Sequence, residues 1–178
     1  MLAAALCALA FSFFMPAAVA QSYVRGMLYH LSSAKYPDRV LSYDAQSGAA
    51  VLEKADAAEA HQHWTLSELS GSWRIINPFE NLALRTAGDA LEAGENNGSD
   101  EAQLWNTVPD GNALLLVPTN RPTVAAACVG DQLVLLPVEK ARGNRTAHFR
   151  IERAERAGFD VSLTYSKRSV AQHPLELG

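Results

Sequence analysis

Short runs of apolar residues, separated by polar turns, recur along most of the chain. Runs of this length, bounded by Gly, Asn, Ser and Asp, are typical of β-strands rather than helices. We predict nine such strands in three sets of three: residues 27–31, 39–43 and 50–52; residues 73–77, 82–86 and 90–92; and residues 114–117, 125–129 and 133–136.

An aromatic motif follows each set and predicts a fourth strand. Gln62-His63-Trp64 recurs 41 residues later as Gln103-Leu104-Trp105, and a weaker copy, Ala147-His148-Phe149, follows after 44 more residues. Repeats of about 40 residues cannot bury their apolar faces alone, so they pack on one another. The chain therefore predicts one domain over residues 21–157, with units near 23–71, 72–111 and 112–156.

The motif residues are expected to be structural. Residues two apart in a strand point to the same side, so Gln62 and Trp64 are expected to face the interior together. Trp64, Trp105 and Phe149 are predicted core aromatics. A buried amide needs hydrogen-bond partners, so Gln62 and Gln103 are expected to hold nearby backbone.

Residues 53–61 are rich in Ala and Glu, which locally favours a helix. The corresponding stretches of the other two units, residues 94–98 and 141–144, have loop composition. We therefore predict a loop over 53–61, with at most one helical turn.

These repeats resemble the β-trefoil of the ricin B-chain lectin type, whose units carry a Gln-x-Trp signature in the last strand. The resemblance covers residues 23–155 and implies an all-β fold of three pseudo-threefold repeats with four strands each. A two-sheet sandwich is the competing architecture. The equal spacing of similar units favours the trefoil.

The resemblance also implies a sugar pocket in each unit, made of an Asp after the second strand, a third-strand aromatic and an Asn before the motif. None of the three units has this set. In our alignment these positions hold Ser42, Arg85 and Cys128; Leu52, Leu91 and Leu135; and His61, Ala102 and Thr146. We predict instead a carbohydrate site at Tyr43, Asp44 and His61, where a carboxylate lies near two rings.

The first 20 residues include 18 apolar ones and end in Ala18-Val19-Ala20, which predicts a signal peptide over residues 1–20 and a secreted protein, periplasmic or extracellular. A membrane span is the competing interpretation. Pro16 and the small residues favour cleavage, so no stable membrane span is expected afterwards. Residues 158–178 are predicted to form a further strand or a tail.

Charge and cysteine content narrow the function further. The 178 residues carry a net charge of −4, which excludes a strongly basic nucleic-acid binder. Arginines from 142 to 156 alternate with glutamates, which predicts a solvated face of mixed charge. Cys7 lies in the leader, so Cys128 is expected to be an unpaired, buried thiol.

Catalytic and metal motifs are not recognisable in the sequence. We find no nucleophile elbow, phosphate loop or His-Glu-x-x-His pair, so neither an enzyme nor a cofactor is expected. His61 and His63 have a spacing that suits zinc or copper, but no third ligand is visible nearby. We therefore expect no metal site.

The sequence thus predicts a secreted, non-catalytic module that binds a glycan, a polysaccharide or a glycan-bearing surface. The alternative is a trefoil scaffold that binds a protein surface, as an interaction module or inhibitor, without sugar binding. Fold alone does not decide between them.

Overall fold

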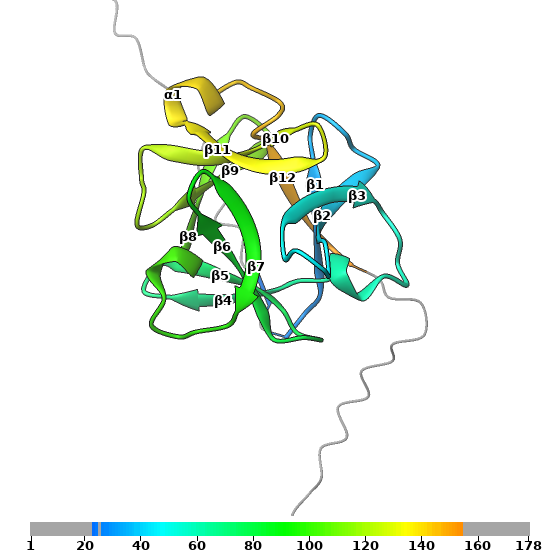
Figure 1. The fold of residues 1–178 in the computed structure, drawn as a ribbon. Helices are drawn as coiled ribbons and strands as arrows, with labels where there is room; N and C mark the ends of the chain where they lie inside the picture. The colour runs from blue at the N-terminus through cyan, green and yellow to red at the C-terminus, as the bar shows by residue number, and fades with distance from the viewer. Residues whose placement is uncertain (1–22, 25, 155–178) are drawn as a thin grey trace, which may run out of the picture.

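A computed structural model describes residues 23–24 and 26–154. This part of the chain is all-β except for short helical turns (Figure 1). Its elements are β1 (Tyr29–Ser33), β2 (Arg39–Tyr43), β3 (Ala50–Lys54), η1 (Ala60–Gln62), β4 (Thr65–Leu69), β5 (Ser72–Asn77), β6 (Leu82–Ala87), β7 (Ala90–Glu95), η2 (Glu101–Gln103), β8 (Trp105–Asp110), β9 (Ala113–Pro118), β10 (Val124–Val129), β11 (Gln132–Pro137), α1 (Val138–Ala141) and β12 (Phe149–Arg153).

Six strands form a closed antiparallel barrel. Around the ring, β1 pairs with β12, β12 with β9, β9 with β8, β8 with β5, and β5 with β4. The ring closes through Tyr29 and Trp64, where Tyr29 N donates to Trp64 O at 2.7 Å and Trp64 N donates to Tyr29 O at 3.0 Å. Closure leaves the barrel without a free sheet edge.

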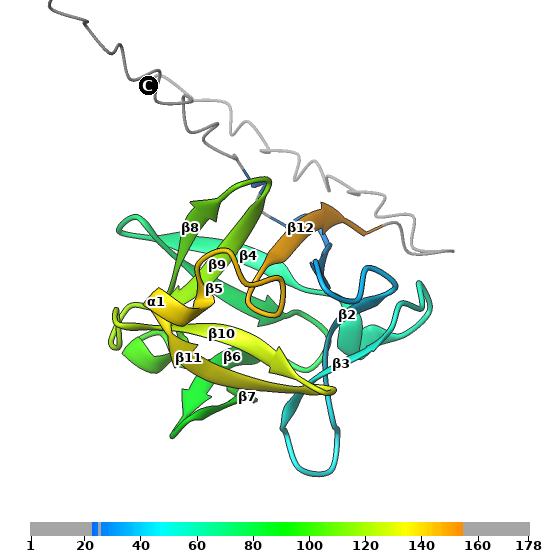
Figure 2. The ribbon, with the colours of Figure 1, turned by 90° about the horizontal axis from the view of Figure 1, so that it is seen from above.

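Three hairpins, β2–β3, β6–β7 and β10–β11, meet around a common centre (Figures 1 and 2). Each donates one backbone hydrogen bond to a neighbouring hairpin and accepts one from the other. The bonds run from Leu52 N to Asp131 O (2.7 Å), from Ala93 N to Gly48 O (2.8 Å) and from Leu135 N to Asp89 O (2.9 Å). This cyclic pattern of hydrogen bonds relates the three hairpins by a pseudo-threefold axis. The fold is therefore the predicted β-trefoil rather than a sandwich.

The motif aromatics lie in the core of the barrel. Trp64, Trp105 and Phe149 have no exposed surface. Trp64 Nε1 donates to Leu41 O at 3.0 Å, and Trp105 Nε1 donates to Leu84 O at 2.9 Å. Each indole therefore ties a barrel strand to the hairpin of its own unit.

The motif glutamines are buried, but they do not lie in strands as predicted. Gln62 and Gln103 end the 3-10 turns η1 and η2. Gln62 accepts from Asp56 N at 2.8 Å and donates to Lys54 O at 3.0 Å. Gln103 does the same with Asn97 N at 3.0 Å and Glu95 O at 2.6 Å. An amide that satisfies backbone six and eight residues earlier closes a loop, which an extended strand cannot do.

The third unit differs at this point. Ala147 replaces the glutamine, and the short helix α1, which was not predicted, occupies the preceding loop. Ala141, at the end of α1, and Ala147 pack in a second small apolar cluster. Small residues and a helical turn thus close the third loop without the glutamine bridge.

The nine strands predicted from apolar runs are all present. β1 begins two residues later than expected, and β7 extends three residues further. Residues 53–54 belong to β3, and the rest of the predicted loop is turn, ending in η1. Cys128 is 1% exposed, as expected. The predicted signal peptide and residues 158–178 lie outside the described residues.

Candidate functional site

Each unit has a capped turn just before its aromatic motif. Glu59 Oε1 accepts from His61 N at 3.1 Å, Asp100 Oδ1 accepts from Ala102 N at 3.0 Å, and Asn144 Oδ1 accepts from Thr146 N at 3.0 Å. Each turn lies against the loop that begins the next unit's hairpin. We call these contacts the first, second and third junctions.

The first junction joins residues 59–63 to residues 77–80. His61 Nε2 lies 3.3 Å from Glu80 Oε1, and His61 Nδ1 lies 3.7 Å from Glu59 Oε1. The His61 side chain is 27% exposed, and the two carboxylate side chains are 44% and 49% exposed. Phe79, beside Glu80, is 37% exposed. The first junction thus presents an exposed phenyl ring and an imidazole flanked by two carboxylates.

Asn77 holds the first junction together, and it is fully buried. Asn77 Nδ2 donates to Ala60 O at 2.8 Å and to His63 O at 3.1 Å. Asn77 Oδ1 accepts from Phe79 N and Glu80 N, both at 3.1 Å. These four bonds fix the loop that carries Phe79 and Glu80 relative to the turn that carries His61.

Pro78 explains why an asparagine is needed here. In the third junction the corresponding carbonyl, His148 O, accepts from a backbone amide, Ala34 N, at 2.9 Å. The residue corresponding to Ala34 in the first junction is Pro78, which has no N–H. The side chain of Asn77 supplies the missing donor to His63 O.

The structure brings together two of the three predicted sugar-binding residues. Tyr43 is 2% exposed, and its ring lies 4.5 Å from the His61 ring and 6.0 Å from that of Trp64. Burial raises the pKa of Tyr43, and the neighbouring Glu80 carboxylate raises it further. Tyr43 therefore packs as a buried ring against His61 and does not present an exposed ring on which a sugar could stack.

Asp44 is exposed and caps its own hairpin. Its carboxylate accepts from Ser47 Oγ at 2.7 Å, from Ser47 N at 2.7 Å and from Gln46 N at 3.1 Å. These hydrogen bonds hold the pKa of Asp44 below its usual value, and the bond from the Ser47 hydroxyl has the largest effect. The carboxylates beside His61 are those of Glu59 and Glu80, which the sequence analysis did not select.

His61 and His63 do not point to the same side, as a strand would have required. His61 lies in η1, whereas His63 is fully buried, with its ring 4.8 Å from His30 and 6.2 Å from Phe79. Within residues 23–24 and 26–154, no group of three His, Cys, Asp or Glu side chains is arranged to hold a metal ion.

The second junction has no aromatic side chain at the corresponding places, Ala102 and Asn120. Asp100 lies 3.8 Å from Arg85 there. Nearby, Asp89 pairs with Arg121 at 3.0 Å. The charged groups at and near the second junction are thus largely paired with one another.

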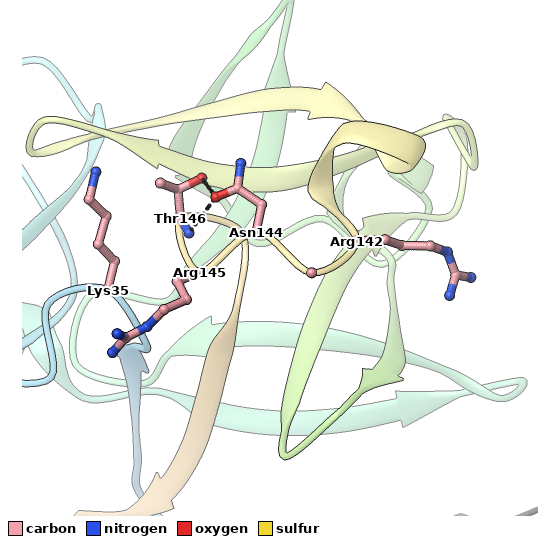
Figure 3. A pocket seen from close by; sticks show the side chains of 6 residues that line it. Lys35, Arg142, Asn144, Arg145 and Thr146 are labelled. Carbon is pink, nitrogen blue, oxygen red and sulfur yellow. Dashed lines mark hydrogen bonds between the residues drawn. The ribbon is translucent and has the colours of Figure 1, made fainter.

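An open pocket of about 600 Å³ lies at the third junction (Figure 3). It is lined by Lys35, Arg142, Gly143, Asn144, Arg145 and Thr146. Arg145 donates to Ala34 O through Nε at 3.2 Å and through Nη2 at 2.6 Å. In Figure 3, Arg142 points away from Lys35 and Arg145. Among residues 23–24 and 26–154, no carboxylate lines this pocket.

No protein-family model matches the chain, and no curated protein sequence matches it. Its fold does match solved structures.

The GlcNAcα1-4Gal-releasing endo-β-galactosidase of Clostridium perfringens matches with a TM-score of 0.65 and 13% identity, over 72% of this chain and 33% of the enzyme. The Polyporus squamosus lectin bound to a sialylated influenza-binding epitope matches with a TM-score of 0.63 and 11% identity, over 74% of this chain and 50% of the lectin.

A designed threefold-symmetric protein, ThreeFoil, matches with a TM-score of 0.58 and 17% identity, over 70% of this chain and 97% of the design. The fold is that of the β-trefoil lectins. This chain thus spans a third of the enzyme and half of the fungal lectin. At these identities the likeness shows the fold alone. In the described part of the chain, no helix has the length and apolar character needed to span a bilayer.

Proposed function

We propose that this protein is a secreted, non-catalytic, carbohydrate-binding trefoil module, and that the first junction is its saccharide site. The observation that carries the proposal is the exposed side chain of Phe79 in the loop that also brings Glu80 to the Glu59–His61–Glu80 group. The fungal lectin with the same fold binds a saccharide, which supports the ligand class.

The chemistry of the first junction suits a pyranose. A phenyl ring packs against the apolar C–H face of a sugar, while carboxylates and an imidazole accept and donate hydrogen bonds to its hydroxyls. Hydrogen bonds to ionised groups are stronger than neutral ones, so Glu59 and Glu80 would set the orientation. Asn77 holds both loops in place, which lowers the entropy lost on binding.

This arrangement differs from the pocket that the ricin-type resemblance implies. The position expected to hold Asp is Ser42, whose side chain is fully buried. The first junction takes its carboxylates from the two loops instead. The proposed ligand therefore lies over the contact between the first and second units.

The test is a glycan array followed by calorimetric titration of the saccharides that respond. Phe79→Ala is expected to weaken binding by about tenfold or more, because a central aromatic contact is lost. Leu69→Ala is the matched control, since Leu69 is also an exposed apolar residue, 45% accessible, on β4. Glu80→Gln is compared in the same way with Glu68→Gln.

Absence of any response across the glycan array would contradict the proposal. Capture of a specific extracellular protein, together with that silence, would support the alternative of a protein-binding scaffold. Equal losses in Phe79→Ala and Leu69→Ala would remove the first junction as the site.

The non-catalytic part of the proposal is tested separately, because paired carboxylates also hydrolyse glycosides. Saccharides that bind are incubated with the protein and assayed for new reducing ends. Release that disappears in Glu59→Gln or Glu80→Gln would show an enzyme.

Export is tested by sequencing the amino terminus of protein recovered outside the cytoplasm. The proposal predicts a mature chain that begins at Gln21. Retention of the uncleaved chain in the membrane fraction would contradict it.

A further inference from the structure

We infer that the third junction is a second, separate binding site, which takes the sulfate ester or carboxylate of an anionic saccharide. The inference rests on the proposed function for the ligand class, but it uses none of the residues of the first junction. Its pocket is lined on one side by the loop that joins α1 to β12 and on the other side by the loop after β1 (Figure 3).

Two cations face this pocket. The Arg145 guanidinium is anchored by its two hydrogen bonds to Ala34 O, which leaves its remaining N–H groups for a ligand. Lys35 Nζ lies 5.1 Å from the centre of the Tyr36 ring, a cation–π contact that restrains the side chain. In the described part of the chain neither Lys35 nor Arg145 forms a salt bridge with a carboxylate.

Asn144 adds a neutral donor. Its Oδ1 already accepts from Thr146 N at 3.0 Å and from Thr146 Oγ at 2.9 Å. The Asn144 side chain therefore offers its NH₂ group, and Figure 3 shows that group directed away from Thr146. Lys35, Arg145 and Asn144 thus all offer N–H donors to a ligand, which suits an oxyanion rather than a cation.

The Asp110 carboxylate, which contacts Gly143 of the pocket lining, is engaged by other groups. Asp110 Oδ2 accepts from Gly143 N at 2.7 Å and lies 2.8 Å from His148 Nε2. The hydrogen bond from Gly143 N comes first, followed by the hydrogen bond with His148, in holding the pKa of Asp110 below its usual value; the charges of His148 and Arg142 have smaller effects. Arg142 thus lies close enough to Asp110 to act on its carboxylate, and its side chain points away from Lys35 and Arg145 in Figure 3.

The volume of the pocket and the net charge of the chain both favour binding at a defined site over diffuse attraction of polyanions. A pocket of about 600 Å³ is within the range that holds a small ligand. The whole chain has a net charge of −4, which opposes diffuse attraction of polyanions. Binding of an anionic saccharide therefore requires a local group of donors such as the third junction.

The experiment titrates the full chain with heparin, polygalacturonate and neutral dextran at fixed ionic strength. Heparin carries sulfate esters and polygalacturonate only carboxylates, so the two identify the oxyanion. We expect binding of at least one of them and none of dextran at this site. Inorganic sulfate is expected to compete.

Lys35→Glu is expected to weaken that binding by about tenfold, because it reverses a charge at the pocket. Lys54→Glu is the matched control, since Lys54 is exposed on β3, carries the same charge and does not line the pocket. It should change affinity by less than about twofold. Thermal denaturation of both variants checks that they are folded.

Three results would overturn the inference: no binding of either acidic polysaccharide, equal losses in the two variants, or equally tight binding of duplex DNA. Phe79→Ala separates this inference from the proposed function. It should weaken saccharide binding at the first junction by about tenfold or more, while heparin or polygalacturonate binding is kept.

Discussion

The first and third junctions share a backbone plan but present opposite charges. In both, a capped turn before the aromatic motif lies against the loop of the next unit. The first carries Phe79 and two carboxylates, whereas the third carries Lys35 at the place of Phe79, with Arg145 and Asn144. The trefoil thus determines where these loops lie, while a few exposed side chains determine what each loop can bind.

The interiors of the same two units differ in another way. The first has the Gln62 bridge and an indole that donates to Leu41 O, whereas the third has Ala147 and Phe149, which have no such donors. The third loop is closed by α1 and an apolar cluster instead. Shape and burial are therefore common to the units, but individual hydrogen bonds are not.

Removing a motif ring should have the largest effect on stability. Trp64→Ala, Trp105→Ala and Phe149→Ala are each expected to cost about 3–5 kcal/mol of unfolding free energy, because each leaves a cavity in the core. Urea denaturation measures the loss. An unchanged midpoint in any of the three would show that the unit concerned does not depend on its ring.

Trp105→Phe tests the hydrogen bond apart from the cavity. It removes the donor to Leu84 O and leaves a buried carbonyl unsatisfied, an added cost of about 1–3 kcal/mol. Phe149 shows that phenyl is accepted where no donor is required. A loss in Trp105→Phe no larger than expected for the smaller ring would argue against this hydrogen bond.

Asn77→Ala should distinguish the two junctions. The change leaves several buried groups of the first junction without partners, at about 1–3 kcal/mol, and frees the loop that carries Phe79. Saccharide binding at the first junction should fall, while anion binding at the third should not change. Asn112→Ala, in an exposed turn, is the control.

Gln103→Ala should cost about 1–3 kcal/mol, because Asn97 N and Glu95 O lose a buried partner. The third unit already has alanine at this place, in Ala147, so the effect depends on the loop rather than on the motif. Hydrogen exchange at Asn97 is a local measurement. Unchanged protection there would contradict the bridging role.

Lowering the pH should modestly reduce the stability of the domain, through His30 in the first unit. Burial, then the nearby His63, lowers the pKa of His30 below its ordinary value of 6.5, and Glu152 opposes the shift only in part. The unfolded chain therefore binds a proton before the folded one. The stabilisation is present above pH 6.5 and is lost as the pH falls towards the folded pKa.

The measurement is the melting temperature between pH 7.5 and pH 5. His30→Phe should reduce its dependence on pH, because it removes the group that titrates. The same slope in the variant and the parent would assign the effect to another histidine.

Part of the candidate site was accessible from the sequence. The sequence predicts Tyr43 and His61 as two rings near the Asp44 carboxylate, and the structure places these rings 4.5 Å apart in a tilted arrangement. Asp44 was selected for its carboxylate, but a hairpin Asp binds its own turn. Glu80 and Phe79 could not be selected, since they follow a strand of the next unit and carry no local signature.

The sequence by itself determined the strands, the three units and the buried rings, because apolar spacing and turn residues act over short distances. Only the tertiary structure decided which loops meet. Lys35 and Arg145 lie 110 residues apart, yet Arg145 binds the carbonyl next to Lys35. Barrel closure brings the first and last units together, so that Lys35 of the first unit and Arg145 of the last unit line one pocket.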